Sequence, residues 1–272
     1  MKTRFVLIQT SHAGNVGAVA RAMKVMGFDD LVLVAPRWPN VLRKEETIQR
    51  ASGALDVLKN ARVVETVEEA LDGMTHLCAT AMTPRDFGPP LTTPRAHFAA
   101  LTQPVHEDEV PGEGGVAFLF GSERFGMQNE DVYRCHACLS IPTNPQFGSL
   151  NLAAAVQVIA YEWRMALGGF QGLSGPEGMP AAEAAEAAQA AKAAKAAKAT
   201  QAELADAQQI SGMLQHWQEA LVAIEFLDPD APKKLMPRLN QLFNRAQLTQ
   251  EEIHILRGVA KAMLRSAEKD QA

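Results

Sequence analysis

The stretch TSHAGNVGAVARAM, residues 10–23, places glycines in a turn between an expected strand and an expected helix. This context resembles a dinucleotide-binding turn, but the G-x-G pair is absent and no acidic residue ends the next strand, which disfavours a nicotinamide cofactor. On a helical wheel Arg21 lies roughly opposite the apolar stripe that contains Val16 and Met23. Arg21 is therefore either a solvated side chain or one available to a ligand or a partner.

A second stretch, LFGSERFGM at residues 119–127, is an apolar strand that ends abruptly in a glycine and an acid. Gly121 and Gly126 indicate a tight turn at the carboxyl end of that strand, which is where open α/β sheets bind ligands. Glu123 then points into a crevice or into solvent. The alternative, in which Glu123 and Arg124 are solvent-exposed loop residues without a functional role, stays open.

The third stretch, FGSLNLAAAVQVIAYE at residues 147–162, begins as a loop and continues as a helix. Ser149 is expected to cap a helix that begins near Leu150. Asn151 is then unusual, because an asparagine inside a first turn competes with the helix backbone. Together with the free amides of a helix terminus, the two side chains would suit an anionic or polar ligand.

Metal or nucleophile chemistry finds little support in the sequence motifs. Cys135 and Cys138 flank a histidine, but a zinc site would need a second ligand pair at matching spacing, and the remaining cysteine is Cys78. No stretch has the G-x-S-x-G form of a nucleophile elbow. We therefore expect no metal.

Composition indicates a soluble, cytoplasmic protein that does not bind nucleic acid through bulk charge. The chain has 272 residues, three cysteines and a formal net charge of −5. Three cysteines fit a reducing compartment, and no apolar run approaches the roughly 18 residues of a membrane span. A local basic patch remains possible, either as a nucleic-acid contact or as an ordinary solvated helix face. Its residues are Lys233, Lys234, Arg238 and Arg245.

Three zones follow one another along the chain. Residues 1–169 alternate short apolar runs with helical patterns, which predicts an α/β domain with a mostly parallel sheet flanked by helices. Residues 170–206 are a Gly/Pro linker followed by an alanine-rich spacer. Residues 207–272 return to helical periodicity, and Thr249 with Glu252 predicts a capping box at the start of the last helix. The buried strands are expected at RFVLIQ, LVLVA, THLCAT, VAFLFG and ACLSIP.

Three motifs together resemble those of the SPOUT-type RNA 2′-O-ribose methyltransferases, in their order and approximate separation. They are SHAGNVGAVARAMKVMGF, FLFGSERFGM and IPTNPQFGSLNLAAAVQVIAYE. The resemblance covers nearly all of residues 4–168 and resumes in the basic helical tail, as in the members that methylate nucleotide 32 of the tRNA anticodon loop. It implies a C-terminal trefoil knot, an S-adenosyl-L-methionine cofactor, a tRNA substrate and a homodimer.

The resemblance also implies roles for individual residues. The catalytic set would be Asn15, Arg21, Glu123, Ser149 and Asn151, and the RNA contacts would come from the basic patch. The cofactor would lie against Thr80, Ala81, Met82, Gly121, Ile141, Gly148, Ser149 and Leu150. One position departs from the family pattern, since Gly148 stands where a second serine is common. A backbone contact there would survive this change, whereas a side-chain contact would not.

The implied reaction explains why both Ser149 and Asn151 stand at one helix start. Methyl transfer from a sulfonium to a ribose hydroxyl requires the oxygen, carbon and sulfur atoms to be aligned. Arg21 would contact the target phosphate or the developing alkoxide, either within its own chain or across a dimer, although a guanidinium is a poor proton acceptor. Two alternatives stay open: a relative acting on ribosomal RNA or another tRNA position, and a non-catalytic RNA-binding homologue.

Overall fold

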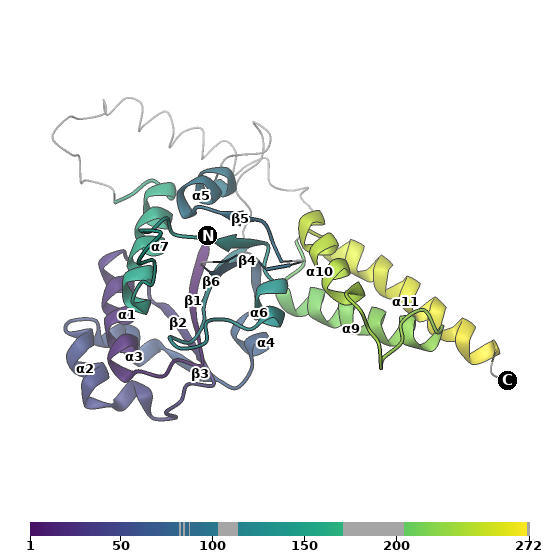
Figure 1. The fold of residues 1–272 in the computed structure, drawn as a ribbon, viewed down its shortest axis with the longest axis horizontal. Coiled ribbons are helices and arrows are strands. Elements are labelled where there is room, and N and C mark those ends of the chain that lie inside the picture. Colours follow the sequence, from purple (N-terminus) through teal and green to yellow (C-terminus); the bar gives the residue numbers. More distant parts are fainter. Residues whose placement is uncertain (82, 84, 87, 103–113, 171–203, 271–272) are drawn as a thin grey trace.

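The structure of the protein is a computed structural model that describes residues 1–270 except 82, 84, 87, 103–113 and 171–203. Its centre is a seven-stranded sheet in the order β3-β2-β1-β6-β4-β7-β5 (Figure 1). Every pairing within it is parallel. The strands are β1 (Lys2–Ile8), β2 (Asp30–Val34), β3 (Arg62–Val64), β4 (Met74–Thr80), β5 (Leu91–Thr92), β6 (Gly115–Phe120) and β7 (Ala137–Leu139).

Helices cover both faces of this sheet, which is why β6, at its centre, is apolar and buried along its whole length. On β1, Phe5 and Leu7 enter the core beneath one helical layer, while Val6 and Ile8 enter the core beneath the other. The first layer contains α1 (Ala13–Val25), α2 (Glu45–Ala51), α3 (Leu55–Asn60), α5 (Pro94–Thr102) and α7 (Leu152–Ala166), with the short 3-10 turn η1 (Val41–Arg43). The second contains α4 (Val67–Ala70) and α6 (Asn129–Tyr133).

Helix α1 packs closely against α2 because glycine faces the contact. A Cβ added at Gly17 would collide with the backbone carbonyl oxygen of Thr47. The helix ends where Gly27 adopts a φ of +71°, a left-handed conformation that glycine tolerates at helix ends. The predicted apolar stripe is confirmed, since Val16 and Met23 are fully buried.

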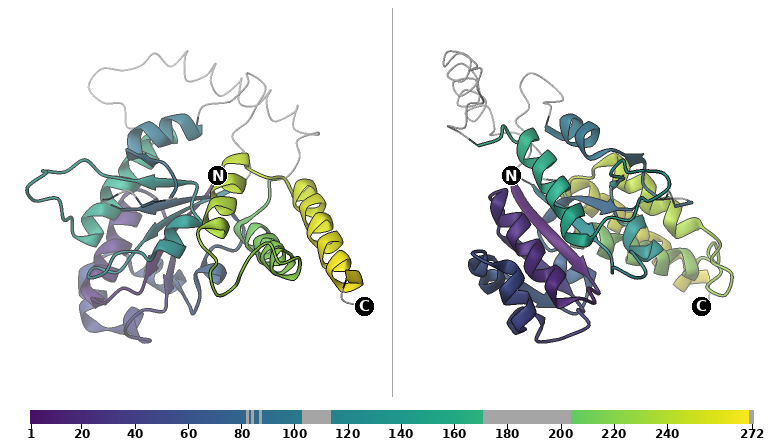
Figure 2. Two further views of the ribbon diagram at one scale, coloured as in Figure 1. Left: turned by 45° about the vertical axis from the view of Figure 1, so that its right-hand side comes forward. Right: turned by 60° about the vertical axis from the view of Figure 1, so that its left-hand side comes forward.

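The C-terminal extension forms a separate small core of helices α9 (Ala207–Ala223), α10 (Leu235–Ala246) and α11 (Gln250–Asp270). Figure 2 shows this group beside the sheet. Helix α9 contacts α4. The predicted capping box is confirmed: the Thr249 backbone N–H donates to the Glu252 carboxylate at 2.8 Å, and the Glu252 N–H donates back to the Thr249 hydroxyl at 3.3 Å. Asn244 of α10 donates to the carbonyls of Tyr133 and Cys135, both at 3.4 Å, and so joins the two parts of the molecule.

The predicted fold class is confirmed, and all five expected strands are present. Strands β3 and β5 were not predicted from the sequence; they are edge strands of three and two residues. The expected spacer at residues 170–206 falls largely outside the described residues, and the chain is described again from Leu204. Among the helices described, none is long and apolar enough to cross a membrane.

Candidate active site

Three loops meet at the carboxyl edge of the sheet because their strands are neighbours. In the order β6-β4-β7, the residues after Phe120, Thr80 and Leu139 leave the same edge side by side. The Ala81 N–H donates to the Leu139 carbonyl at 3.1 Å and ties two of these loops together. The expected cofactor residues Thr80, Ala81, Gly121 and Ile141 therefore lie on adjacent strand ends, whereas Met82 falls outside the described residues.

Glu123 is the acceptor at the centre of a polar cluster. Its carboxylate accepts hydrogen bonds from the Thr10 hydroxyl at 3.0 Å, from the Ser11 backbone N–H at 2.8 Å and from the Ser11 hydroxyl at 2.9 Å. The Asn15 side-chain amide donates to the same carboxylate at 2.8 Å. The glutamate thus anchors the turn between β1 and α1, and it is not merely a solvent-exposed loop residue.

These hydrogen bonds hold Glu123 in its charged form. Partial burial alone would raise the pKa of Glu123, but the hydrogen bonds from Asn15 and Ser11 outweigh it and lower the pKa to about 2. A carboxylate with so low a pKa is a weak base at neutral pH. Its geometry suits positioning of its neighbours better than proton transfer.

The two asparagines continue the chain of hydrogen bonds to the third motif. The Asn151 side-chain amide donates to Asn15 Oδ1 at 3.0 Å, and Asn151 Oδ1 accepts from the Ala153 N–H at 2.9 Å. Asn151 is therefore the N-cap of α7, and the expectation that Ser149 caps this helix is wrong. The helix begins two residues later than predicted because the asparagine oxygen reaches an amide of the first turn. Ser149 is exposed and makes no side-chain hydrogen bond with the described residues.

Arg21 stands apart from this network within one chain. It lies six residues beyond Asn15 on α1, which is about 9 Å along the helix axis and on a different side of it. Its side chain is exposed, as the helical wheel predicts. The structure thus joins Asn15, Glu123 and Asn151, but it does not bring Arg21 to them within a single chain.

The cofactor side of the edge has accessible loop backbone and apolar side chains. Gly148, Ser149 and Leu150 lie between a turn and α7 without regular secondary structure, and Leu150 is 40% exposed. At Gly121 a Cβ would collide with the backbone of Gly126, so this glycine is needed to close the turn. The turn therefore requires glycine at this position, whether or not a ligand contacts the residue.

Arg85, in the loop after β4, is a polar residue at this edge that the sequence motifs did not indicate. Its Nη2 donates to the Met127 carbonyl at 3.4 Å, while its buried Nε has no hydrogen-bond partner among the described residues. A buried donor of this kind is costly unless something accepts from it.

The predicted basic patch lies on α10 and the turn before it. Lys234, Arg238 and Arg245 follow one another at intervals of four and seven residues, which places them along one side of the helix. Lys233 precedes the helix, and all four side chains are exposed. Gln241 of the same helix donates to the Gly88 carbonyl at 3.0 Å, in the loop that follows β4. The patch is therefore on the helix that contacts a loop of the carboxyl edge.

Residues 2–161 match the SpoU rRNA Methylase family, and residues 208–272 match the C-terminal domain of tRNA methyltransferase TrmJ. The chain belongs to the SpoU methylase family. It is a methyltransferase whose family uses S-adenosyl-L-methionine, as the motifs implied. Family membership also implies the trefoil knot expected in the C-terminal part of the α/β domain.

Relatives share both parts of the chain. The TrmJ tRNA (cytidine/uridine/adenosine-2′-O-)-methyltransferase of Pseudomonas aeruginosa is 41% identical over 95% of this chain and 92% of its own length. The TrmJ tRNA (cytidine/uridine-2′-O-)-methyltransferase of Klebsiella pneumoniae is 38% identical over 94% of this chain and 93% of its own. The crystal structure of TrmJ from Z. mobilis superposes with a TM-score of 0.73 at 30% identity, covering 97% of this chain and 99% of that one.

Sequence reasoning found the acceptor of the polar cluster but missed two of its donors. Thr10 and Ser11 lie within the first motif, but the sequence did not indicate a role for either, although both donate hydrogen bonds to Glu123. Their position directly after a buried strand, beside the glycine turn, was the available signal. Arg85 had no such signal, because its burial depends on contacts made after folding.

Proposed function

We propose that this protein transfers a methyl group from S-adenosyl-L-methionine to the ribose 2′-hydroxyl of a pyrimidine nucleotide in tRNA, at position 32 of the anticodon loop, in the cytoplasm. The observation that carries the proposal is the hydrogen-bonded series Glu123–Asn15–Asn151, which links all three motif loops at one edge of the sheet. The near full-length similarity to TrmJ enzymes supports tRNA as the substrate. Three free cysteines support a reducing compartment.

In this proposal the chain's residues align the reactants. The cofactor supplies an activated methyl group on sulfur, and residues 148–150, with Thr80 and Ala81, hold it at the carboxyl edge. Ser149 and Asn151 orient the attacking hydroxyl at the start of α7, where free backbone amides favour a developing negative charge. Glu123 keeps Asn15, and through it Asn151, in place. Arg21 neutralises the target phosphate or the developing alkoxide. In the transfer the hydroxyl proton would pass to water, and the sulfur would keep the electron pair of the broken bond and leave as a neutral thioether.

A homodimer would bring Arg21 to a site from which it is separated in one chain. Helices α1 and α7 pack side by side (Figure 1). Apolar side chains remain exposed on both helices. Val25 is 55% exposed, Tyr161 48% and Met165 52%. Val25 follows Arg21 by one helical turn, so a second copy that covers this apolar surface would also contact the arginine. Burial of such a surface is the usual driving force for a homodimer.

Nucleoside mass spectrometry of tRNA tests the function directly. Cells that lack the protein should lose a ribose methylation at position 32, and purified protein with S-adenosyl-L-methionine should restore it. Loss of a methylation from ribosomal RNA, or from another position of tRNA, would show that the protein has a different substrate within the same family. Intact methylation throughout, together with no cofactor binding in calorimetry, would indicate a non-catalytic homologue.

Mixing two variants tests the placement of Arg21. Arg21→Ala and Asn151→Ala should each abolish methylation, and Arg21→Ala should retain cofactor binding. If the arginine acts across the dimer, unfolding and refolding the two together restores about a quarter of the wild-type activity, because half of the dimers are mixed and each has one complete site. An inactive mixture would place the arginine in its own subunit's site. Arg50→Ala, an exposed arginine on α2, is the matched control and should remain active.

The basic patch is tested by the salt dependence of tRNA binding. The logarithm of the tRNA association constant falls as the logarithm of the salt concentration rises. Replacing Lys233, Lys234 and Arg238 by alanine should make this fall less steep by about 0.7–0.9 for each phosphate contact that is lost. Alanine at the exposed Lys59 and Arg50, on the opposite helical layer, should leave the slope unchanged. An unaltered slope in the triple variant would rule out the patch.

A further inference from the structure

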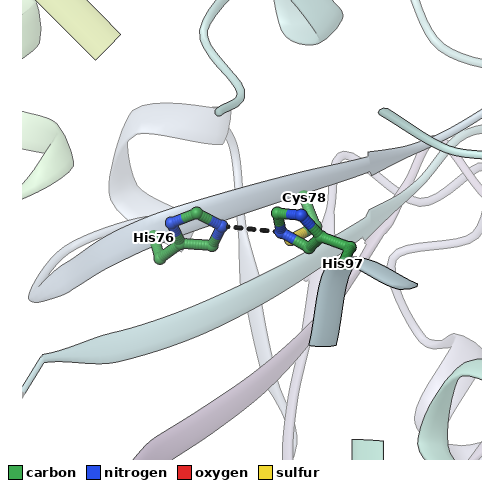
Figure 3. Close-up of side chains that lie close together, drawn as sticks. All are labelled: His76, Cys78 and His97. Atoms are coloured by element: carbon green, nitrogen blue, oxygen red, sulfur yellow. Dashed lines mark hydrogen bonds between the residues drawn. The ribbon is translucent and has the colours of Figure 1, made fainter. Parts of the chain in front are cut away.

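Three side chains that sequence motifs did not connect lie together beside the centre of the sheet. His76 and Cys78 are two residues apart on β4, so both side chains project from one face of the strand. His97 comes from α5, which packs over that face. Figure 3 shows the His97 ring facing His76. The two Nε2 atoms are 3.0 Å apart. The candidate ligand atoms of the three residues all lie within 4.8 Å of one another.

We infer that His76, Cys78 and His97 form a zinc site. Two imidazole nitrogens bound to one tetrahedral zinc are separated by about 3.3 Å, because each Zn–N bond is about 2.0 Å long. The observed 3.0 Å between Nε2 atoms is close to this separation. The nitrogen and sulfur atoms of a tetrahedral zinc site are about 3.5 Å apart, and the three ligand atoms here lie within 4.8 Å of one another, so zinc binding requires the side chains to close by up to about 1 Å. Two nitrogens and one sulfur are a donor set that zinc favours, and the fourth position would hold water.

The alternative is a hydrogen bond between two neutral imidazoles without metal. That pairing needs one ring to be protonated at Nε2 and the other at Nδ1, whereas a bound cation lets both Nε2 lone pairs point inward. In that alternative Cys78, which is fully buried, is an apolar packing residue of the core. A bound cation would let this thiol ionise.

The surroundings would hold the site in shape. His136 stacks on His76 with 4.8 Å between ring centroids, and its Nδ1 accepts the Leu77 backbone N–H at 3.1 Å. The third histidine therefore supports the first and does not offer that nitrogen to the metal. His76 and His97 are both partly exposed, which gives an ion a path to the site.

The zinc would have a structural role in this protein. His76 is four residues before Thr80, so the metal would lie about 13 Å along the strand from the carboxyl edge. It would clamp α5 onto β4, and β4 carries the expected cofactor residues at its end. Removing the metal should therefore lower stability more than it lowers cofactor affinity.

Metal titration of the full-length protein tests this site. Protein stripped with EDTA is titrated with Zn²⁺ in competition with a chromophoric chelator, and with Co²⁺ while near-ultraviolet absorbance is followed. We expect one ion per chain, a thiolate-to-cobalt charge-transfer band, and a rise in Tm on adding Zn²⁺. His97→Ala and Cys78→Ala should each weaken zinc binding by more than about 100-fold. His254→Ala and Cys138→Ala, a histidine and a cysteine outside the cluster, should bind as the wild type does.

The wild-type protein alone can overturn the inference. Sub-stoichiometric zinc uptake, or cobalt bound without a charge-transfer band, would leave only a hydrogen-bonded imidazole pair. Equal affinity in His97→Ala and the wild type would do the same. Circular dichroism in EDTA establishes whether each variant folds. If a variant does not fold, the zinc stoichiometry and the cobalt spectrum of the wild-type protein decide whether the site binds metal.

Discussion

Replacing Glu123 by glutamine tests whether this side chain positions the site by its charge. The carboxylate accepts from Thr10, Ser11 and Asn15, and it has only acceptor atoms. An amide keeps one acceptor oxygen and turns an NH₂ group toward donors. At neutral pH the variant therefore loses charge-assisted hydrogen bonds and leaves at least one donor unpaired.

The magnitude follows from the lowered pKa. A change from the ordinary value of 4.5 to about 2 corresponds to about 3 kcal/mol of folding free energy. Water reaches part of this carboxyl group, so screening reduces the contribution to about 1–2 kcal/mol. Because the folded-state pKa is the lower one, the stabilisation is fully present above pH 4.5 and is lost as the pH falls from 4.5 toward 2.

Thermal unfolding of the wild type and Glu123→Gln between pH 7 and pH 3.5 measures this contribution. The variant should melt several degrees lower at pH 7, with a gap in Tm that narrows below pH 4.5. Methylation should show a reduced kcat with little change in the KM for cofactor, because the alignment of Asn15 and Asn151 is lost. The exposed Glu65→Gln is the control and should show neither effect. A gap that is independent of pH would refute the assignment of this stabilisation to the glutamate charge.

Substitutions in three further parts of the molecule have expected outcomes in thermal or denaturant unfolding. Gly17→Ala should lower the unfolding free energy by about 1–3 kcal/mol, since its Cβ meets the backbone of Thr47, whereas Gly14→Ala meets only a flexible side chain and should cost less; equal losses would contradict the packing argument. Asn151→Ala removes the α7 cap and should cost about 1 kcal/mol, and Asn151→Ser should recover most of this stability but not activity. Arg4→Met should cost about 3 kcal/mol, because the buried guanidinium pairs with Asp30 and two carbonyls; a neutral effect would show that apolar packing replaces it.

The sequence alone was sufficient for the class of fold and for the family. Short apolar runs such as those of β1 and β6 alternate with helical patterns, and this alternation indicates a parallel sheet whose strands are buried on both faces. The capping box at Thr249 was readable because it is set by residues three apart. Ser149 was misread because serine and asparagine are both good N-caps, and the choice between them depends on Asn15, which is 136 residues away.

Local pattern therefore determined which segments become strands and helices, and the order of motifs determined the chemistry that they resemble. Only the tertiary structure decided which side chains meet. Glu123 joins Asn15 across 108 residues, and His97 joins His76 across 21, since parallel strands and their helices bring distant segments together at one edge or one face. The spacing of residues along a chain carries no record of such contacts, because they arise from sheet order and packing.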